Sequence, residues 1–242
     1  MHATDMRSIN RAARVAGWIY LSMMFTAPLT LIYIPNKLVV RGDATATASH
    51  ILNHEMLFRV GIVAELVGAI TFILLGLALY RLFSGVSKAH ASVMVAFMLV
   101  SAAVGFANVV NNAAALTAFR GTDSLAAFTQ PQRDALGMLF LGLYRQGLAM
   151  QEMFWGLWIF PFGVLVIKSR FLPRLLGVWL LVNGAAYVAL SLIALLWPSY
   201  SGLAFRAAQP ALLGELWIML WLVIKGAKIT EAMPQPLAAA RA

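Results

Sequence analysis

Residues 145–162 read RQGLAMQEMFWGLWIFPF, a run that is long and apolar enough to cross a membrane as a helix. Gln151 and Glu152 interrupt its apolar residues. A carboxylate at the centre of a bilayer costs about 2.5–3.5 kcal/mol on insertion scales, so we expect Glu152 to face protein or water rather than lipid. Aromatic side chains surround this acid in the sequence: Phe154, Trp155, Trp158, Phe160 and Phe162. The stretch therefore predicts a transmembrane helix that contributes to a functional site.

The composition of the whole chain places it in the class of polytopic membrane proteins. Hydrophobic residues make up 62% of the 242 residues and charged residues 11%, and the mean hydropathy is +0.82. Soluble domains are about half apolar and about a quarter charged. The absence of cysteine excludes disulfides and Cys-ligated metals. The net charge of +9 comes from basic residues at the termini and in short loops, which fits anionic lipid headgroups rather than nucleic acid.

Six apolar segments predict an all-α integral membrane bundle of six transmembrane helices, with short interfacial helices on the outer side. The expected spans are residues 14–34, 56–81, 90–119, 146–168, 172–197 and 210–227. Residues 1–13 are expected to form a cytoplasmic N-terminus, and residues 229–242 a disordered cytoplasmic tail.

Local signals refine these boundaries. Asp43 is a good N-cap for a short interfacial helix over residues 44–54. The helical pattern over residues 135–167 is too long for one span, so we expect a bend at Gly142 or Gly147 and a first part along the membrane surface. Residues 198–209 are expected to form a loop, with Pro210 starting the last span.

The distribution of basic residues predicts the topology. Six spans place both termini on the same side, where eleven Lys and Arg residues then lie, against seven on the other side. Because Lys and Arg are enriched in cytoplasmic loops, we expect both termini in the cytoplasm.

Short motifs are spread over nearly the whole chain. The most specific is FLPRLLG at residues 171–177, which follows FWGLW at residues 154–158. Further motifs are Ala13–Tyr20, Gly42-Asp43, Phe58–Gly61, Gly214-Glu215 and Leu220-Trp221. Together they resemble a family of bacterial multipass membrane proteins, domain of unknown function 4386 (DUF4386). The resemblance implies a small protein of the bacterial inner (plasma) membrane and implies no particular activity.

Polar side chains recur at similar depth inside the expected spans. Counted from the expected outer ends at about 1.5 Å per residue, Glu65, Glu152 and Glu215 lie roughly 8–14 Å below the same surface. We therefore expect these acids to converge on one compartment, and we take them as candidate catalytic residues. The candidate ligand-binding residues are Asn108, Asn111, Asn112, Arg145, Gln151, Trp155, Trp158, Asn183 and Tyr187.

The same residues also allow a structural interpretation. Asn, Gln and Ser side chains in membrane spans often only hydrogen-bond a neighbouring helix, and a buried acid can be a purely structural group. The aromatic side chains of the fourth span can line a pocket or face lipid. His50 and His54 are spaced i, i+4 but lack a third ligand on their helix, so we predict no metal site. No sequence fingerprint of a cofactor is present, and we expect none.

Three functional hypotheses follow from this pattern. The first is an aromatic-walled cavity, lined by carboxylates and amides in the outer half of the membrane, that binds or processes a lipid-like (isoprenoid or acyl) ligand. Acid catalysis by the glutamates is the expected chemistry if the protein is an enzyme. The second is a proton-coupled transporter of a small amphipathic solute. The third is a non-catalytic membrane assembly component that packs through its glycine-rich helix faces. The expected partners are membrane lipids and a lipid-like small molecule, not nucleic acid.

Overall fold

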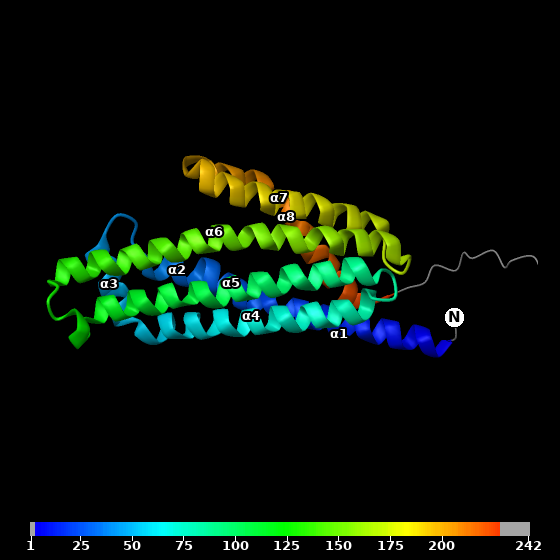
Figure 1. The fold of residues 1–242 in the computed structure, drawn as a ribbon, viewed down its shortest axis with the longest axis horizontal. Coiled ribbons are helices and arrows are strands. Elements are labelled where there is room, and N and C mark those ends of the chain that lie inside the picture. Colours follow the sequence, from blue (N-terminus) through cyan, green and yellow to red (C-terminus); the bar gives the residue numbers. More distant parts are fainter. Residues whose placement is uncertain (1–2, 228–242) are drawn as a thin grey trace, which may run out of the picture.

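The computed structural model describes residues 3–227, with side chains from Arg7 onward, and these residues form helices joined by short turns (Figure 1). Among them, six helical segments are long and apolar enough to cross a membrane. The predicted all-α class with six membrane-spanning helices is therefore confirmed.

The six long helices are α1 (Ala3–Pro28), α4 (Glu55–Phe83), α5 (Lys88–Arg120), α6 (Gln130–Ser169), α7 (Arg174–Leu196) and α8 (Ser201–Ile224). A π-helical turn, η1 (Leu29–Tyr33), and α2 (Ile34–Leu38) continue α1. The remaining short elements are α3 (Ala44–Asn53) and two 3₁₀ turns, η2 (Asp123–Leu125) and η3 (Pro198–Tyr200).

The long helices form a closed ring. Each helix packs against the next one along the chain, and α8 returns to pack against α1. Gly17 makes this closure possible, because a Cβ at that position would lie 2.8 Å from the Leu222 side chain and the Val223 backbone. The ring order α1–α4–α5–α6–α7–α8 therefore leaves an interior that all six helices can reach.

Two buried apolar cores hold the ring together, one near each end. The larger core, near the N-terminal end, is built around large side chains such as Phe83, Trp158 and Phe162. The smaller core, at the opposite end, contains Ile51 and Phe119 and joins α2 and α3 to α4, α5 and α6. The space between the two cores is where polar side chains gather.

The start of α3 follows the predicted capping. The Asp43 carboxylate accepts a 2.8 Å hydrogen bond from the Ala46 backbone N–H, as an N-cap residue should. Gly42 precedes it with φ +79°, a left-handed conformation that favours glycine. The buried Thr47 hydroxyl then donates to the Val40 carbonyl at 3.1 Å and holds the loop against the helix.

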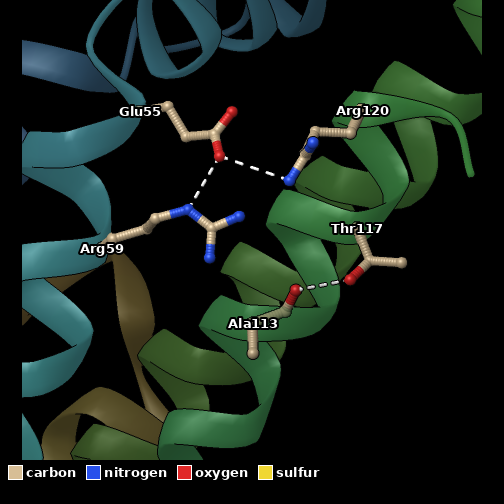
Figure 2. A network of polar contacts seen from close by, with 5 residues as sticks. All are labelled: Glu55, Arg59, Ala113, Thr117 and Arg120. Carbon is tan, nitrogen blue, oxygen red and sulfur yellow. Dashed lines mark hydrogen bonds and ion pairs between the residues drawn. The ribbon is translucent and has the colours of Figure 1, made fainter.

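An ion-pair network joins the start of α4 to the end of α5 near this second core (Figure 2). Glu55 accepts from Arg59 at 2.7 Å and from Arg120 at 3.4 Å. The side chains are partly exposed, so we expect each pair to contribute only about 0–1 kcal/mol.

Two local expectations were wrong. We expected a bend at Gly142 or Gly147 and a first part along the membrane surface, but α6 is one continuous helix of 40 residues that runs along the whole bundle (Figure 1). Gly147 instead lies in close contact with the Asn108 side chain of α5. Helix α8 starts at Ser201, so the expected loop over residues 198–209 is largely helical and Pro210 lies inside the helix. The Gln209 amide donates to the Phe205 carbonyl at 3.3 Å beside this proline.

Candidate functional site

A cavity of about 410 Å³ lies inside the ring between the two cores. All six long helices contribute to its wall, which consists mainly of apolar side chains. Its polar lining residues are Tyr20, Thr26, Thr30, Glu65, Asn108, Tyr144, Gln151, Tyr187, Gln209 and Glu215. A mostly apolar pocket with a few convergent polar groups is the usual form of a small-molecule site.

One polar group of the cavity is centred on Glu215 of α8. The hydroxyl of Tyr20, on α1, donates a hydrogen bond to the Glu215 carboxyl group. The Tyr187 side chain of α7 lies within hydrogen-bonding reach of the same carboxyl. Asn183, one turn earlier on α7, also lies near this carboxyl and donates to the Leu212 carbonyl at 3.3 Å, which fixes α7 against α8. The Glu215 carboxyl is therefore bonded by a hydroxyl of α1 and lies beside two polar side chains of α7.

A second polar group is centred on Glu65 of α4. The Asn112 amide of α5 donates to the Glu65 carboxyl at 3.2 Å, and the Tyr144 side chain of α6 lies within hydrogen-bonding reach of it. The Asn108 amide donates to the Tyr144 carbonyl at 2.9 Å. Asn111 donates in turn to the Asn108 side-chain oxygen at 3.1 Å.

Where α5 and α6 pack together, two amide side chains, Asn108 and Gln151, are each held by a backbone carbonyl of the other helix. Gln151 of α6 donates to the Ser101 carbonyl of α5 at 3.2 Å and lies against Gly105. Asn108 of α5 lies in the same way against Gly147 of α6. Each helix thus places an amide side chain against a glycine of the other helix. Asn108 and Gln151 line the cavity and also hold α5 and α6 together.

Aromatic side chains form the floor of the cavity. The buried Trp158 ring lies with its centroid 5.5 Å from Phe72 and 6.0 Å from Tyr20. The Trp155 ring meets the Tyr187 ring edge-on at 5.9 Å. Edge-to-face contacts at these distances stabilise aromatic pairs by about 0.5–1.5 kcal/mol beyond their burial. The aromatic lining residues of the cavity are therefore packed against one another.

The structure brings together a part of the predicted site. The predicted residues that line the cavity are Glu65, Asn108, Gln151, Trp155, Trp158, Tyr187 and Glu215. The predicted residues outside the lining are Asn111, Asn112, Arg145, Glu152 and Asn183.

Two of the residues outside the lining differ in their surroundings. Arg145 is exposed. Glu152 is half-buried.

The two lining acids do not share one layer. Glu215 lies ten residues before Lys225 at the end of α8, and Glu65 sixteen residues before Arg81 near the end of α4. At about 1.5 Å per residue, they lie roughly 15 Å and 24 Å from the end of the bundle that carries the N-terminus. The expectation of a shared layer came from starting the last span at Pro210, whereas α8 begins at Ser201. Glu215 therefore lies farther from the outer end of its helix than expected.

Sequence reasoning missed Tyr20 and Tyr144 as members of the site. A tyrosine in the interior of an apolar span needs a partner for its hydroxyl, and this was the available signal. The partner acids are 195 residues from Tyr20 and 79 residues from Tyr144 along the chain, so only the fold shows them. No three His, Asp or Glu side chains in the part of the chain that the structure describes come together to hold a metal ion.

Comparison with known proteins defines the family. The family model described as "Domain of unknown function (DUF4386)" matches residues 15–226. The chain belongs to the DUF4386 family. An uncharacterized protein of Archaeoglobus fulgidus is 29% identical over 159 residues, which are 66% of this chain and 79% of that protein. No solved structure matches the chain. The matched family region contains all six long apolar helices except the first residues of α1, so the cavity lies within it.

Proposed function

We propose that this multipass membrane protein binds a lipid-like ligand, with an isoprenoid or acyl chain, in the cavity between its two cores. The observation that carries the proposal is the cavity wall, which is apolar and aromatic apart from the groups centred on Glu65 and Glu215. Such a wall buries a hydrocarbon chain at about 25 cal/mol per Å² of apolar surface. The polar groups give the ligand's head a defined position.

The exposed lining residues indicate how a ligand reaches the cavity. Four lining residues are exposed, and all lie on the continuous first span or on α8: Met24, Leu31, Gln209 and Leu213. Pro28 and the π-helical turn η1 interrupt the regular helix on the same side. Since π-helical turns occur frequently at functional sites, we place ligand access from the bilayer between α1 and α8 at these exposed residues, beyond the contact of Gly17 with Leu222 that closes the ring.

A cavity-filling substitution tests the proposal. Gly68 lines the cavity, and a Cβ there meets only the Thr26 hydroxyl at 3.7 Å, so Gly68→Leu fits the backbone while occupying the cavity. The matched control is Gly142→Leu on α6, where a Cβ has no neighbour within 4 Å. We expect apolar molecules extracted from purified wild type and Gly142→Leu to include the same retained compound by mass spectrometry. Gly68→Leu should lose most of it.

If the same compound is retained at equal levels by all three proteins, the cavity is not its binding site. If wild type in mild detergent retains no compound and binds no added lipid-like molecule, the proposed function is wrong.

Proton-coupled transport is a second candidate function. It is favoured by two carboxyl groups that line the same cavity at different depths, because intramembrane carboxylates are common elements of proton relays. Purified protein in vesicles would then take up an amphipathic solute faster when a pH gradient is imposed. Uptake that ignores the gradient would leave ligand binding as the only supported function.

We also propose that the termini lie in the cytoplasm and that the membrane is the bacterial inner membrane. In the described residues, nine basic residues lie at the end of the bundle that carries the N-terminus: Arg7, Arg11, Arg14, Arg81, Lys88, Lys168, Arg170, Arg174 and Lys225. Short cytoplasmic loops carry such an excess of Lys and Arg.

Single cysteines test this topology, because the chain has no cysteine of its own. Gly85→Cys lies in the turn between α4 and α5, and Ser124→Cys lies in the connection between α5 and α6, both at exposed positions. In intact cells, a membrane-impermeant maleimide should label Ser124→Cys and spare Gly85→Cys until the cells are permeabilised. The reverse labelling pattern would show that the orientation is inverted.

A further inference from the structure

Among the described residues, the cavity wall contains acidic side chains but no basic ones. Two carboxyl groups, of Glu65 and Glu215, line the cavity. No Lys, Arg or His lines it within the described range 7–227. The basic residue next to a lining residue in sequence is Arg145, beside Tyr144, and it is exposed. An anionic ligand head would therefore find no basic partner in this cavity, whereas a cationic head would find two carboxyl groups.

The surroundings of Glu215 are aromatic as well as acidic. Tyr20 of α1 donates to its carboxyl group, Tyr187 of α7 lies near the same group, and Trp155 contacts Tyr187 edge-on. These rings and Trp158 all line the cavity. The faces of Trp and Tyr rings attract ammonium groups, by about 2 kcal/mol or more where water is excluded, and aromatic cages with this composition recognise quaternary ammonium ligands.

We propose that the ligand is a cationic amphiphile, an alkylamine or quaternary ammonium lipid, whose charged head lies at Glu215 among Tyr20, Trp155 and Tyr187. Its apolar chain extends along the cavity toward the opening between α1 and α8. This inference rests on the proposed function, because it specifies the head of the ligand that the cavity binds. A neutral head can use the tyrosine hydroxyls but leaves the carboxyl group without a counter-charge, so we expect it to bind more weakly.

Three probes of equal chain length separate these cases. Dodecyltrimethylammonium, dodecanol and dodecanoate carry a positive, a neutral and a negative head on the same chain. Each is titrated into wild-type protein in lipid nanodiscs, the two ionic probes below their critical micelle concentrations and dodecanol below its solubility limit, and binding to empty nanodiscs is subtracted. We expect dodecyltrimethylammonium to bind at least about tenfold more tightly than dodecanol. Dodecanoate should bind more weakly than dodecanol.

Two variants connect the preference to the named residues. Glu215→Gln keeps the size of the side chain and removes its charge, and it should reduce the tenfold preference to about twofold or less while dodecanol still binds. Trp155→Leu removes one aromatic ring from the cavity wall. It should also weaken binding of dodecyltrimethylammonium, by a smaller factor than Glu215→Gln does. The matched control is Glu55→Gln, which removes a carboxylate from the exposed ion-pair network outside the cavity and should leave all three affinities unchanged.

The outcomes distinguish this inference from the proposed function. Equal binding of the three probes, or tighter binding of dodecanoate, would overturn the cationic head and leave a cavity for lipid-like chains. A cation preference that persists in both Glu215→Gln and Trp155→Leu would overturn the placement of the head at Glu215. Absence of binding by all three probes to wild type would contradict the proposed function itself.

Discussion

Replacing Gly147 by leucine is expected to destabilise the protein by about 3 kcal/mol or more, because α5 and α6 can no longer approach each other. A Cβ at position 147 would overlap the side-chain oxygen of Asn108. Asn108 cannot move away without giving up the 2.9 Å hydrogen bond that its amide donates to the Tyr144 carbonyl. The substitution therefore costs both overpacking and a buried hydrogen bond.

The control for this prediction lies on the same helix. Gly142→Leu adds the same side chain at a position where a Cβ has no neighbour within 4 Å. We expect it to change the free energy of unfolding by less than about 0.5 kcal/mol. Both variants can be compared by titrating SDS into mixed micelles and following helicity. Similar stabilities for Gly147→Leu and Gly142→Leu would contradict the described packing between α5 and α6.

Replacing Tyr20 by phenylalanine is expected to cost about 1–3 kcal/mol of stability, because the Glu215 carboxyl group then loses a hydroxyl donor inside the bundle. Tyr20 is only 4% exposed, so water cannot readily replace the lost hydroxyl. In a double-mutant cycle with Glu215→Gln, we expect a coupling energy of about 0.5–3 kcal/mol between the two positions.

Tyr33→Phe is the matched control for Tyr20→Phe. Tyr33 lies on the same continuous first span, but its side chain is exposed and its hydroxyl contacts only Lys37 at 3.4 Å among the hydrogen bonds of the described residues. We expect its removal to change stability by less than about 0.5 kcal/mol. A coupling energy near zero between Tyr20 and Glu215 would show that their hydrogen bond does not stabilise the bundle.

The number and type of the helices could be predicted from the sequence because bilayer thickness demands about 20 apolar residues for each span. The start of α3 could be predicted because Asp43 forms an N-cap through a local hydrogen bond. The start of α8 could not, because Pro198 and Pro210 are both usual first-turn residues and only tertiary packing selects between them.

The sequence was sufficient to select individual residues of the candidate site by their type. It was not sufficient to predict which residues they contact. Intramembrane acids and amides are costly in lipid, which is why Glu65, Glu215 and Asn108 could be selected. Their partners depend on how each helix is rotated about its axis, and hydropathy does not determine that rotation for helices with weak amphipathicity. For this reason Glu152 was expected in the cavity and lies outside its lining, whereas Tyr144 was not expected and lies within it.

A structure of the protein in lipid nanodiscs, determined by electron cryomicroscopy, would show whether the cavity holds a lipid-like ligand. We expect elongated non-protein density in the cavity between Glu215 and Glu65, reaching the bilayer between Met24 of α1 and Leu213 of α8. Density that ends in a compact head beside Tyr20 and Trp155 would fit the proposed ligand. A cavity closed by packed side chains, with α1 and α8 in continuous contact and no such density, would contradict it.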